Sequence, residues 1–88
     1  MAFKKKEDLV FEKIDNEYII FDPYNEAFFE FNGVASLVWE VLESLERDDI
    51  VQKVCTEYAV DEKTALRDVS AFFDELINMQ LIYRVGKE

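Results

Sequence analysis

The sequence predicts an α+β fold, in which an N-terminal three-stranded antiparallel β-meander is followed by three helices. Short runs rich in aromatic and β-branched residues, separated by turn residues, occupy positions 9–32. From about residue 33 the apolar residues recur instead at three- and four-residue steps, which is the period of a helix. The length of 88 residues fits one domain, so we expect residues 1–88 to fold as a single unit.

Three strands are expected, at LVFEKI (9–14), EYIIFD (17–22) and AFFEFN (27–32). Asp15-Asn16 separates the first two runs and is a two-residue hairpin signal. Pro23, in the stretch Asp22-Pro23-Tyr24-Asn25, presets φ for a turn before the third strand. These turns predict a meander in which consecutive strands pair.

The helices are expected at 33–45, from about 48 to 59, and at 61–80, and LIYRV (81–85) can form a last short strand. Asn32 can cap the first helix, Asp48 or Asp49 the second, and Asp61 the third. Val69, Phe72 and Leu76 are expected to fill the core from the third helix. Three helices with short connections indicate a helix-turn-helix, and the added strands make it a winged one.

The charge of the chain argues against DNA, which is the usual ligand of a winged helix-turn-helix. The net charge is −10, and without Lys4, Lys5 and Lys6 the remaining chain has seven basic residues against 20 acids. The third helix, which would enter a DNA groove, carries five acids and two bases. We therefore expect repulsion of nucleic acid and of anionic membranes, and a protein partner instead.

Composition also disfavours an enzyme. There is no histidine, so the commonest general base is missing, and one cysteine without histidine makes no thiolate–imidazole zinc site. Cys55 is expected to be a small buried hydrophobe. Two glycines exclude a Gly-rich phosphate loop, so no cofactor, metal or catalytic residue is expected.

Two features bear on location. No apolar run approaches the roughly 20 residues of a membrane span. MAFKKKEDL at the start has positive charge but no apolar stretch after it, so it does not read as a signal peptide. A cytoplasmic protein is expected.

The order of these signals resembles PqqD-like proteins. FDPYNEAFFEFNGVASLVWEVLE (21–43) is similar to their strand–turn–strand–helix block, and YAVDEKTALRDVSAFFDELINMQLI (58–82) is similar to their C-terminal block. The resemblance covers roughly residues 9–83 and lies in the whole pattern, because no single motif is catalytic. One departure is that Asn32 is followed by Gly33-Val34-Ala35, where proteins of the pyrroloquinoline quinone pathway usually carry Thr-Ala.

The resemblance implies a peptide-binding module without catalysis. PqqD-like proteins hold the leader segment of a ribosomally made precursor peptide and present it to a modifying enzyme, such as a radical SAM enzyme or a leader peptidase. In them the leader adds as a strand beside the third β-strand, in a groove closed by the third helix. The departure after Asn32 makes a lasso-peptide or other peptide pathway fit at least as well as the quinone pathway.

The expected peptide-binding residues lie on that strand and that helix. On the strand they are Ala27, Phe28, Phe29, Glu30 and Phe31, and on the helix Lys63, Leu66, Arg67, Ser70 and Phe73. The strand contains no lysine or proline, the residues that commonly protect a free edge. Arg67 can pair with an acidic residue of the leader, and its alternative is a surface pair with Glu62 or Asp68.

Several alternatives stay open at this stage. Phe29 and Phe31 are expected to face the helices, where they can be plain core residues. Phe28 lies on the other face with Glu30, which leaves three roles for it: a groove wall, a contact in a homodimer, or a contact with a partner. The alternative function is a winged-helix transcriptional regulator that acts through DNA or protein contacts.

Overall fold

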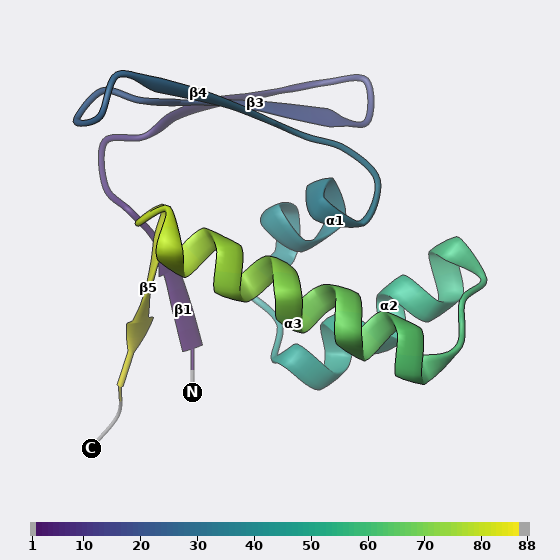
Figure 1. Cartoon of the computed structure of the whole chain (residues 1–88). Coiled ribbons are helices and arrows are strands. Elements are labelled where there is room, and N and C mark those ends of the chain that lie inside the picture. Colours follow the sequence, from purple (N-terminus) through teal and green to yellow (C-terminus); the bar gives the residue numbers. More distant parts are fainter. Residues whose placement is uncertain (1, 87–88) are drawn as a thin grey trace.

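The runs between residues 9 and 32 form the expected meander in the computed structural model, which describes residues 2–86 (Figure 1). Strands β2 (Val10–Ile14), β3 (Glu17–Asp22) and β4 (Ala27–Phe31) make one antiparallel sheet in the order β2-β3-β4. Both hairpin turns lie where the sequence predicts them, at 15–16 and 23–26. Asp15 adopts a φ of 57°, which a two-residue hairpin turn requires of its first position.

Three helices follow, α1 (Val34–Val41), α2 (Arg47–Tyr58) and α3 (Glu62–Asn78). The prediction of 33–45 for the first helix was too long, because the N–H groups of Ser44 and Leu45 both bond to the Val41 carbonyl, at 3.0 Å, and close a turn there. The prediction for the third helix is confirmed within two residues at each end.

One of the three predicted helix caps is confirmed. The Asp61 carboxylate accepts a hydrogen bond from the Thr64 N–H at 2.8 Å, so it caps α3. The cap at Asn32 was wrong, because Gly33 occupies that position with φ 59°, a conformation that glycine adopts without a Cβ clash. The cap at Asp48 or Asp49 was also wrong, since α2 begins earlier, after Glu46, and places both in its first turn.

A second sheet was missed by the sequence prediction. Strand β1 (Ala2–Lys5) pairs antiparallel with β5 (Ile82–Val85), the short strand expected near the end of the chain. The Lys6 N–H continues this pairing with a bond of 2.8 Å to the Leu81 carbonyl. The two-stranded sheet ties the start of the chain to the end of α3, and Phe3 stacks on Phe73 with ring centroids 4.7 Å apart.

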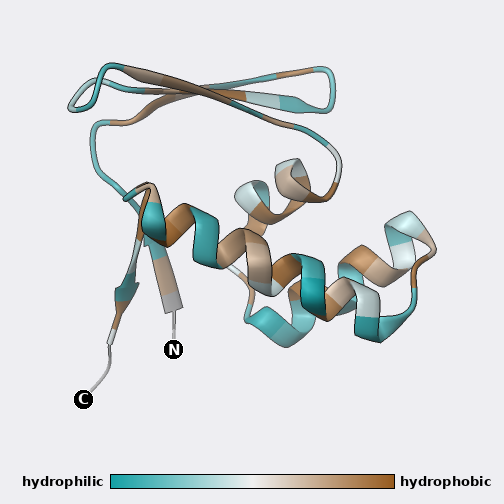
Figure 2. Cartoon of the chain, viewed as in Figure 1, coloured by the Kyte–Doolittle hydropathy of each residue, from teal (hydrophilic) through white to brown (hydrophobic). Residues whose placement is uncertain are grey.

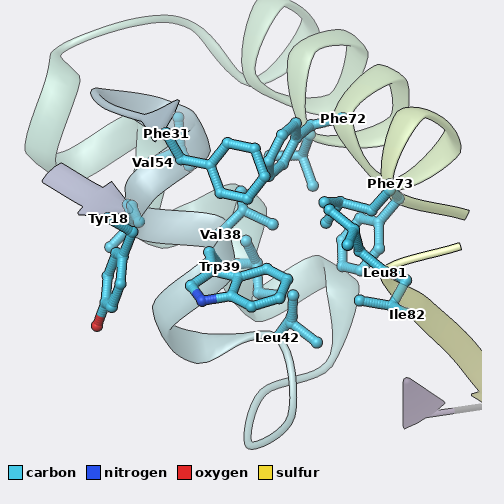
Figure 3. Close-up of a cluster of buried hydrophobic side chains, with 14 of the residues drawn as sticks. Tyr18, Phe31, Val38, Trp39, Leu42, Val54, Phe72, Phe73, Leu81 and Ile82 are labelled. Atoms are coloured by element: carbon cyan, nitrogen blue, oxygen red, sulfur yellow. The ribbon is translucent and has the colours of Figure 1, made fainter. Parts of the chain in front are cut away.

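The core lies between the inner face of the three-stranded sheet and the helices (Figure 3). Trp39 of α1 is at its centre, with the Phe31 ring 5.6 Å away, and Phe72 of α3 meets Phe31 edge to face at 5.0 Å. Val69, Phe72 and Leu76 are buried as predicted. Cys55 is only half-buried but packs against this core, so its predicted role as a small hydrophobe is partly met.

Candidate functional site

Strand β4 is at one edge of the three-stranded sheet. It pairs with β3 alone, and no other strand within residues 2–86 lies on its second side. Its side chains alternate as predicted: Phe29 and Phe31 turn toward the helices, while Phe28 and Glu30 are exposed. An edge strand of this kind has a row of N–H and C=O groups that can pair with another strand.

The hairpin geometry shows which groups of β4 are free. In a two-residue hairpin the residues that flank the turn, here Ile14 and Glu17, exchange both of their backbone bonds. Bonded and non-bonded pairs then alternate, so β3 uses Tyr18, Ile20 and Asp22 to bond to β4. Their partners are Phe31, Phe29 and Ala27. The N–H and C=O groups of Phe28 and Glu30 therefore point to the open edge.

The opposite edge of the sheet, along β2, is less suited to a new strand. The Lys5 ammonium lies 4.7 Å from the ring centroid of Phe11 on this strand. Lys13, also on β2, forms an ion pair of 3.2 Å with Glu40 of α1. Lysines on an edge strand oppose pairing with a further strand. Strand β4 has no lysine, so it is the better site for strand addition.

The turn before β4 is held by a buried carboxylate. Asp22 accepts hydrogen bonds from the Tyr24 N–H at 2.9 Å and from the Asn25 side chain at 2.9 Å, and it pairs with the Lys6 ammonium at 3.2 Å. Burial alone would raise the pKa of Asp22, but the bonds from the Asn25 side chain, from Lys6 and from the backbone outweigh it and hold the pKa below its usual value. The turn that starts β4 is thus anchored by the Asp22 carboxylate.

Helix α3 turns one side toward β4, and that side contains Phe72. Its edge-to-face contact with Phe31 is the link between this helix and the edge strand. Ser70 lies about 160° around the helix from Phe72, since each residue turns by about 100°. The Ser70 hydroxyl accepts a bond of 3.3 Å from Arg47 at the start of α2, so its side of the helix faces α2.

The structure therefore separates the predicted helix residues from the predicted strand residues. Leu66 lies one turn before Ser70 and is 45% exposed, on the side toward α2. Phe73 is only 4% exposed and stacks on Phe3, so it belongs to the core. No described contact brings Leu66, Ser70 or Phe73 to β4, and their role in peptide binding stays a prediction. Phe72 was expected to be a core residue only. Its contact with β4 was not predicted, because the periodicity of a helix does not show which strand will pack against it.

The two predicted cations of α3 are at its surface. Arg67 is 74% exposed at its side chain and its Nε lies 3.8 Å from Asp68 Oδ1, which is one of the surface pairs considered as its alternative role. Lys63 is exposed. An exposed pair of this length is weak, so both cations are free to pair with another group, but they lie on the Ser70 side of the helix and not on the Phe72 side that meets β4.

Two pockets accompany the sheet at its opposite ends. One, of about 460 Å³, lies beside the turn that starts β4 and is lined by Lys6, Glu7, Tyr24, Asn25, Gln80 and Tyr83. The other, of about 540 Å³, lies between the 15–16 turn and helices α1 and α2, where Lys13 pairs with Glu40 and Lys53 with Glu57. Ser36 lines the pocket beside α1 and α2, and no described hydrogen bond joins its hydroxyl to a base. Among residues 2–86 no group of three or more His, Cys, Asp or Glu could hold a metal ion, and no helix is long and apolar enough to cross a membrane.

This geometry defines a class of protein: a small winged helix-turn-helix domain that has a free edge strand beside its last helix. The chain belongs to the PqqD family: the family model described as coenzyme PQQ synthesis protein D matches residues 17–82. No curated protein sequence matches the chain significantly.

Two solved structures share the fold over almost the whole chain. The first is TbiB1 in complex with the TbiA(beta) leader peptide, at 29% identity and a TM-score of 0.85, with 96% of this chain and 99% of that chain covered. The second is a lasso peptide synthetase B1 complexed with the leader peptide, at 20% identity and a TM-score of 0.82, with 96% and 100% covered. The α+β fold predicted from sequence is confirmed by these matches, and so is the resemblance to PqqD-like proteins.

Proposed function

We propose that this protein binds the leader segment of a ribosomally synthesised precursor peptide and catalyses no reaction itself. The observation that carries the proposal is the open edge of β4. The backbone N–H and C=O groups of Phe28 and Glu30 point to that edge, and the strand has no lysine to protect it. The similarity to TbiB1, which was solved with a leader peptide, supports the same function. The leader adds to β4 as a fourth strand.

Backbone pairing supplies one part of the affinity. The N–H and C=O groups of Phe28 and Glu30 offer four hydrogen bonds, each worth about 0.5–1.5 kcal/mol net, so the edge contributes about 2–6 kcal/mol. We expect a total on the order of −8 to −12 kcal/mol, a dissociation constant between nanomolar and low micromolar. The remainder comes from leader side chains that turn inward, toward the side of α3 that contains Phe72.

The side chains that contribute specificity are proposed on both elements. On β4 they are Ala27, Phe29 and Phe31, whose side chains lie on the inner face of the sheet, next to the position of the added strand. On α3 Arg67 and Lys63 are exposed cations on an acidic protein, about 140° and 180° around the helix from Phe72. A leader that reaches that side of α3 is favoured if it carries an acidic residue beside its apolar ones. Leu66, Ser70 and Phe73 contribute only if the leader wraps around α3 beyond the Phe72 side.

The bound leader is proposed to be presented to a modifying enzyme, either a radical SAM enzyme or a leader peptidase. A lasso-peptide or other peptide pathway is proposed over the quinone pathway, because Gly33-Val34-Ala35 stands in place of the Thr-Ala usual in the quinone pathway. The proposal takes residues 1–88 as one recognition domain that acts in the cytoplasm.

Calorimetric titration tests the proposal. The titrant is the leader segment of a precursor peptide whose gene neighbours the gene for this protein. A dissociation constant at or below the low micromolar range is expected, with no change to the precursor in the absence of an added enzyme. Generic duplex DNA in a gel shift is the matched comparison, and no shift is expected because α3 is acidic. DNA binding without leader binding would favour the regulator instead, and precursor turnover by the protein alone would contradict a purely binding role.

A further inference from the structure

The three-stranded sheet has an outer face that no described element covers. Tyr18, Ile20 and Phe31 are buried on the inner face, so the alternate residues of the strands point outward. We call these alternate residues the outer face: Val10, Glu12, Ile14, Glu17, Ile19, Phe21, Phe28 and Glu30. In Figures 1 and 2 the helices lie on one side of this sheet only, and apolar segments run along its strands.

An apolar row crosses the outer face from one edge to the other. Val10, Phe21 and Phe28 are direct cross-strand neighbours, and the rings of Phe21 and Phe28 lie 4.7 Å apart. Phe28 is 72% exposed and Val10 63%, and Ile14, at the far end of β2, is 51% exposed. None of these packs against the core, so the fold does not need them to be large and apolar. A contiguous exposed apolar patch of this kind indicates an interaction surface.

The charged side chains of the outer face all have one sign. Glu12 and Glu30 flank Ile19 in the next row, and Glu17 is opposite Ile14. The outer face contains no lysine or arginine. A complementary partner therefore carries apolar side chains ringed by Lys or Arg. A second copy of this chain fits poorly, because it would place three carboxylates against three others.

The area of the face limits what it can bind alone. Strands about 4.8 Å apart and five residues of about 3.4 Å each make a face of roughly 200–250 Å², well below the about 800 Å² per partner of a stable interface. A leader strand added to β4 would extend the same face by one strand. Its alternate side chains would lie beside Phe28 and Glu30, so the extended face exists only when the leader is bound.

We propose that the outer face, extended by the bound leader, is the docking surface for the enzyme that modifies the precursor. This inference rests on the proposed leader binding. It assigns to Phe28, whose role the sequence left open, a contact with the enzyme. It also gives the enzyme a physical means to distinguish the loaded protein from the empty one, because only the loaded protein presents the wider face.

The test uses substitutions on β2, two strands away from the edge where the leader binds. Val10→Glu adds a charge within the apolar row, and Glu12→Lys reverses one of the flanking charges. Both positions are exposed, so the fold should persist, as circular dichroism would verify. Tyr58→Glu is the matched control, since Tyr58 is an exposed aromatic at the end of α2 and is not part of the outer face.

Two quantities are measured for each variant: leader affinity by calorimetry, and the affinity of the purified modifying enzyme for the protein preloaded with leader. For Val10→Glu and Glu12→Lys we expect leader affinity within about twofold of the original and enzyme affinity reduced about tenfold or more. Tyr58→Glu should change neither quantity. The enzyme should bind the empty protein more weakly than the loaded one.

The outcomes separate the two proposals. If the unaltered protein fails to bind leader, the proposed function is wrong. If leader binds but both β2 variants retain full enzyme affinity, the docking surface is elsewhere and this inference is overturned. A dimer detected by ultracentrifugation that Val10→Glu dissociates would instead assign the outer face to a second copy of the chain, and would equally overturn it.

Discussion

A proline scan of β4 tests the edge geometry in detail. Proline removes the backbone N–H and places its ring where the hydrogen was. At Phe28 and Glu30 the N–H points to the open edge, so proline removes a bond to the leader and none to β3. At Phe29 and Phe31 the N–H belongs to the ladder with β3, so proline removes an internal bond of the sheet.

The magnitudes follow from these bonds. At the open edge the loss of one bond costs about 0.5–1.5 kcal/mol, and the ring obstructs the neighbouring bond as well, so leader affinity should fall about 5- to 150-fold. Within the ladder, proline leaves a carbonyl of β3 without its donor, which costs about 1–3 kcal/mol of folding free energy, and its ring crowds β3 in addition. Such a loss is a large share of the roughly 5–15 kcal/mol available to a small domain. Phe31 is also buried, so its replacement removes core contacts with Trp39 and Phe72.

Circular dichroism and calorimetric titration on the four variants read both effects. Alanine at each position is the matched control, because it removes the side chain but keeps the N–H. We expect Phe28→Pro and Glu30→Pro to melt cooperatively and bind leader weakly, and Phe29→Pro and Phe31→Pro to be largely unfolded. If all four proline variants stayed folded and bound leader normally, the idea of strand addition to β4 would be refuted.

Three further predictions concern single side chains. Arg67→Glu should weaken leader binding by about 1–3 kcal/mol in calorimetry without unfolding the protein, and unchanged affinity would mean that Arg67 is only a solvated partner of Asp68. Phe73→Ala should lower the free energy of unfolding by about 3–5 kcal/mol in urea titration, because Phe73 is buried against Phe3; a loss of leader affinity at unchanged stability would place it in the peptide site instead. Asp22→Asn should lower the melting temperature at neutral pH. Because the pKa of Asp22 is depressed, its ionised form stabilises the fold above the usual carboxyl pKa of 3.8, and this contribution is lost as the pH falls through the lower folded-state value. The difference in melting temperature should therefore shrink below pH 3.8, and a constant difference across that range would show that the Asp22 charge is unimportant.

The sequence was informative about the fold wherever structure depends on neighbours in the chain. Asp15-Asn16 and Asp22-Pro23 marked the turns, and Asp61 marked the start of α3, because turns and caps are made by bonds within a few residues. Strand β1 was missed because its four residues acquire their structure from pairing with β5, more than 70 residues away. The early end of α1 was missed for a similar reason: the chain leaves the helix where Glu43 accepts a bond from the Lys5 N–H.

The candidate site divides in the same way. Alternation along β4 is a local property, so the sequence correctly placed Phe29 and Phe31 inward and Phe28 outward. The parity of the edge bonds also follows from the length of the first hairpin turn. The side of α3 that faces β4 does not follow from the sequence, since the apolar stripe of the helix includes both Phe72 and Phe73. Only the packing shows that Phe72 contacts β4 while Ser70 contacts Arg47.

Amide hydrogen exchange measured by NMR, with and without leader, tests strand addition most directly. In the free protein the Phe29 and Phe31 amides should be protected by their bonds to β3, whereas the Phe28 and Glu30 amides should exchange rapidly. Saturating leader should protect Phe28 and Glu30 and leave the other two protected. Leader binding that leaves the Phe28 and Glu30 amides in rapid exchange would contradict the account, because the peptide would then be bound without pairing to the edge of β4.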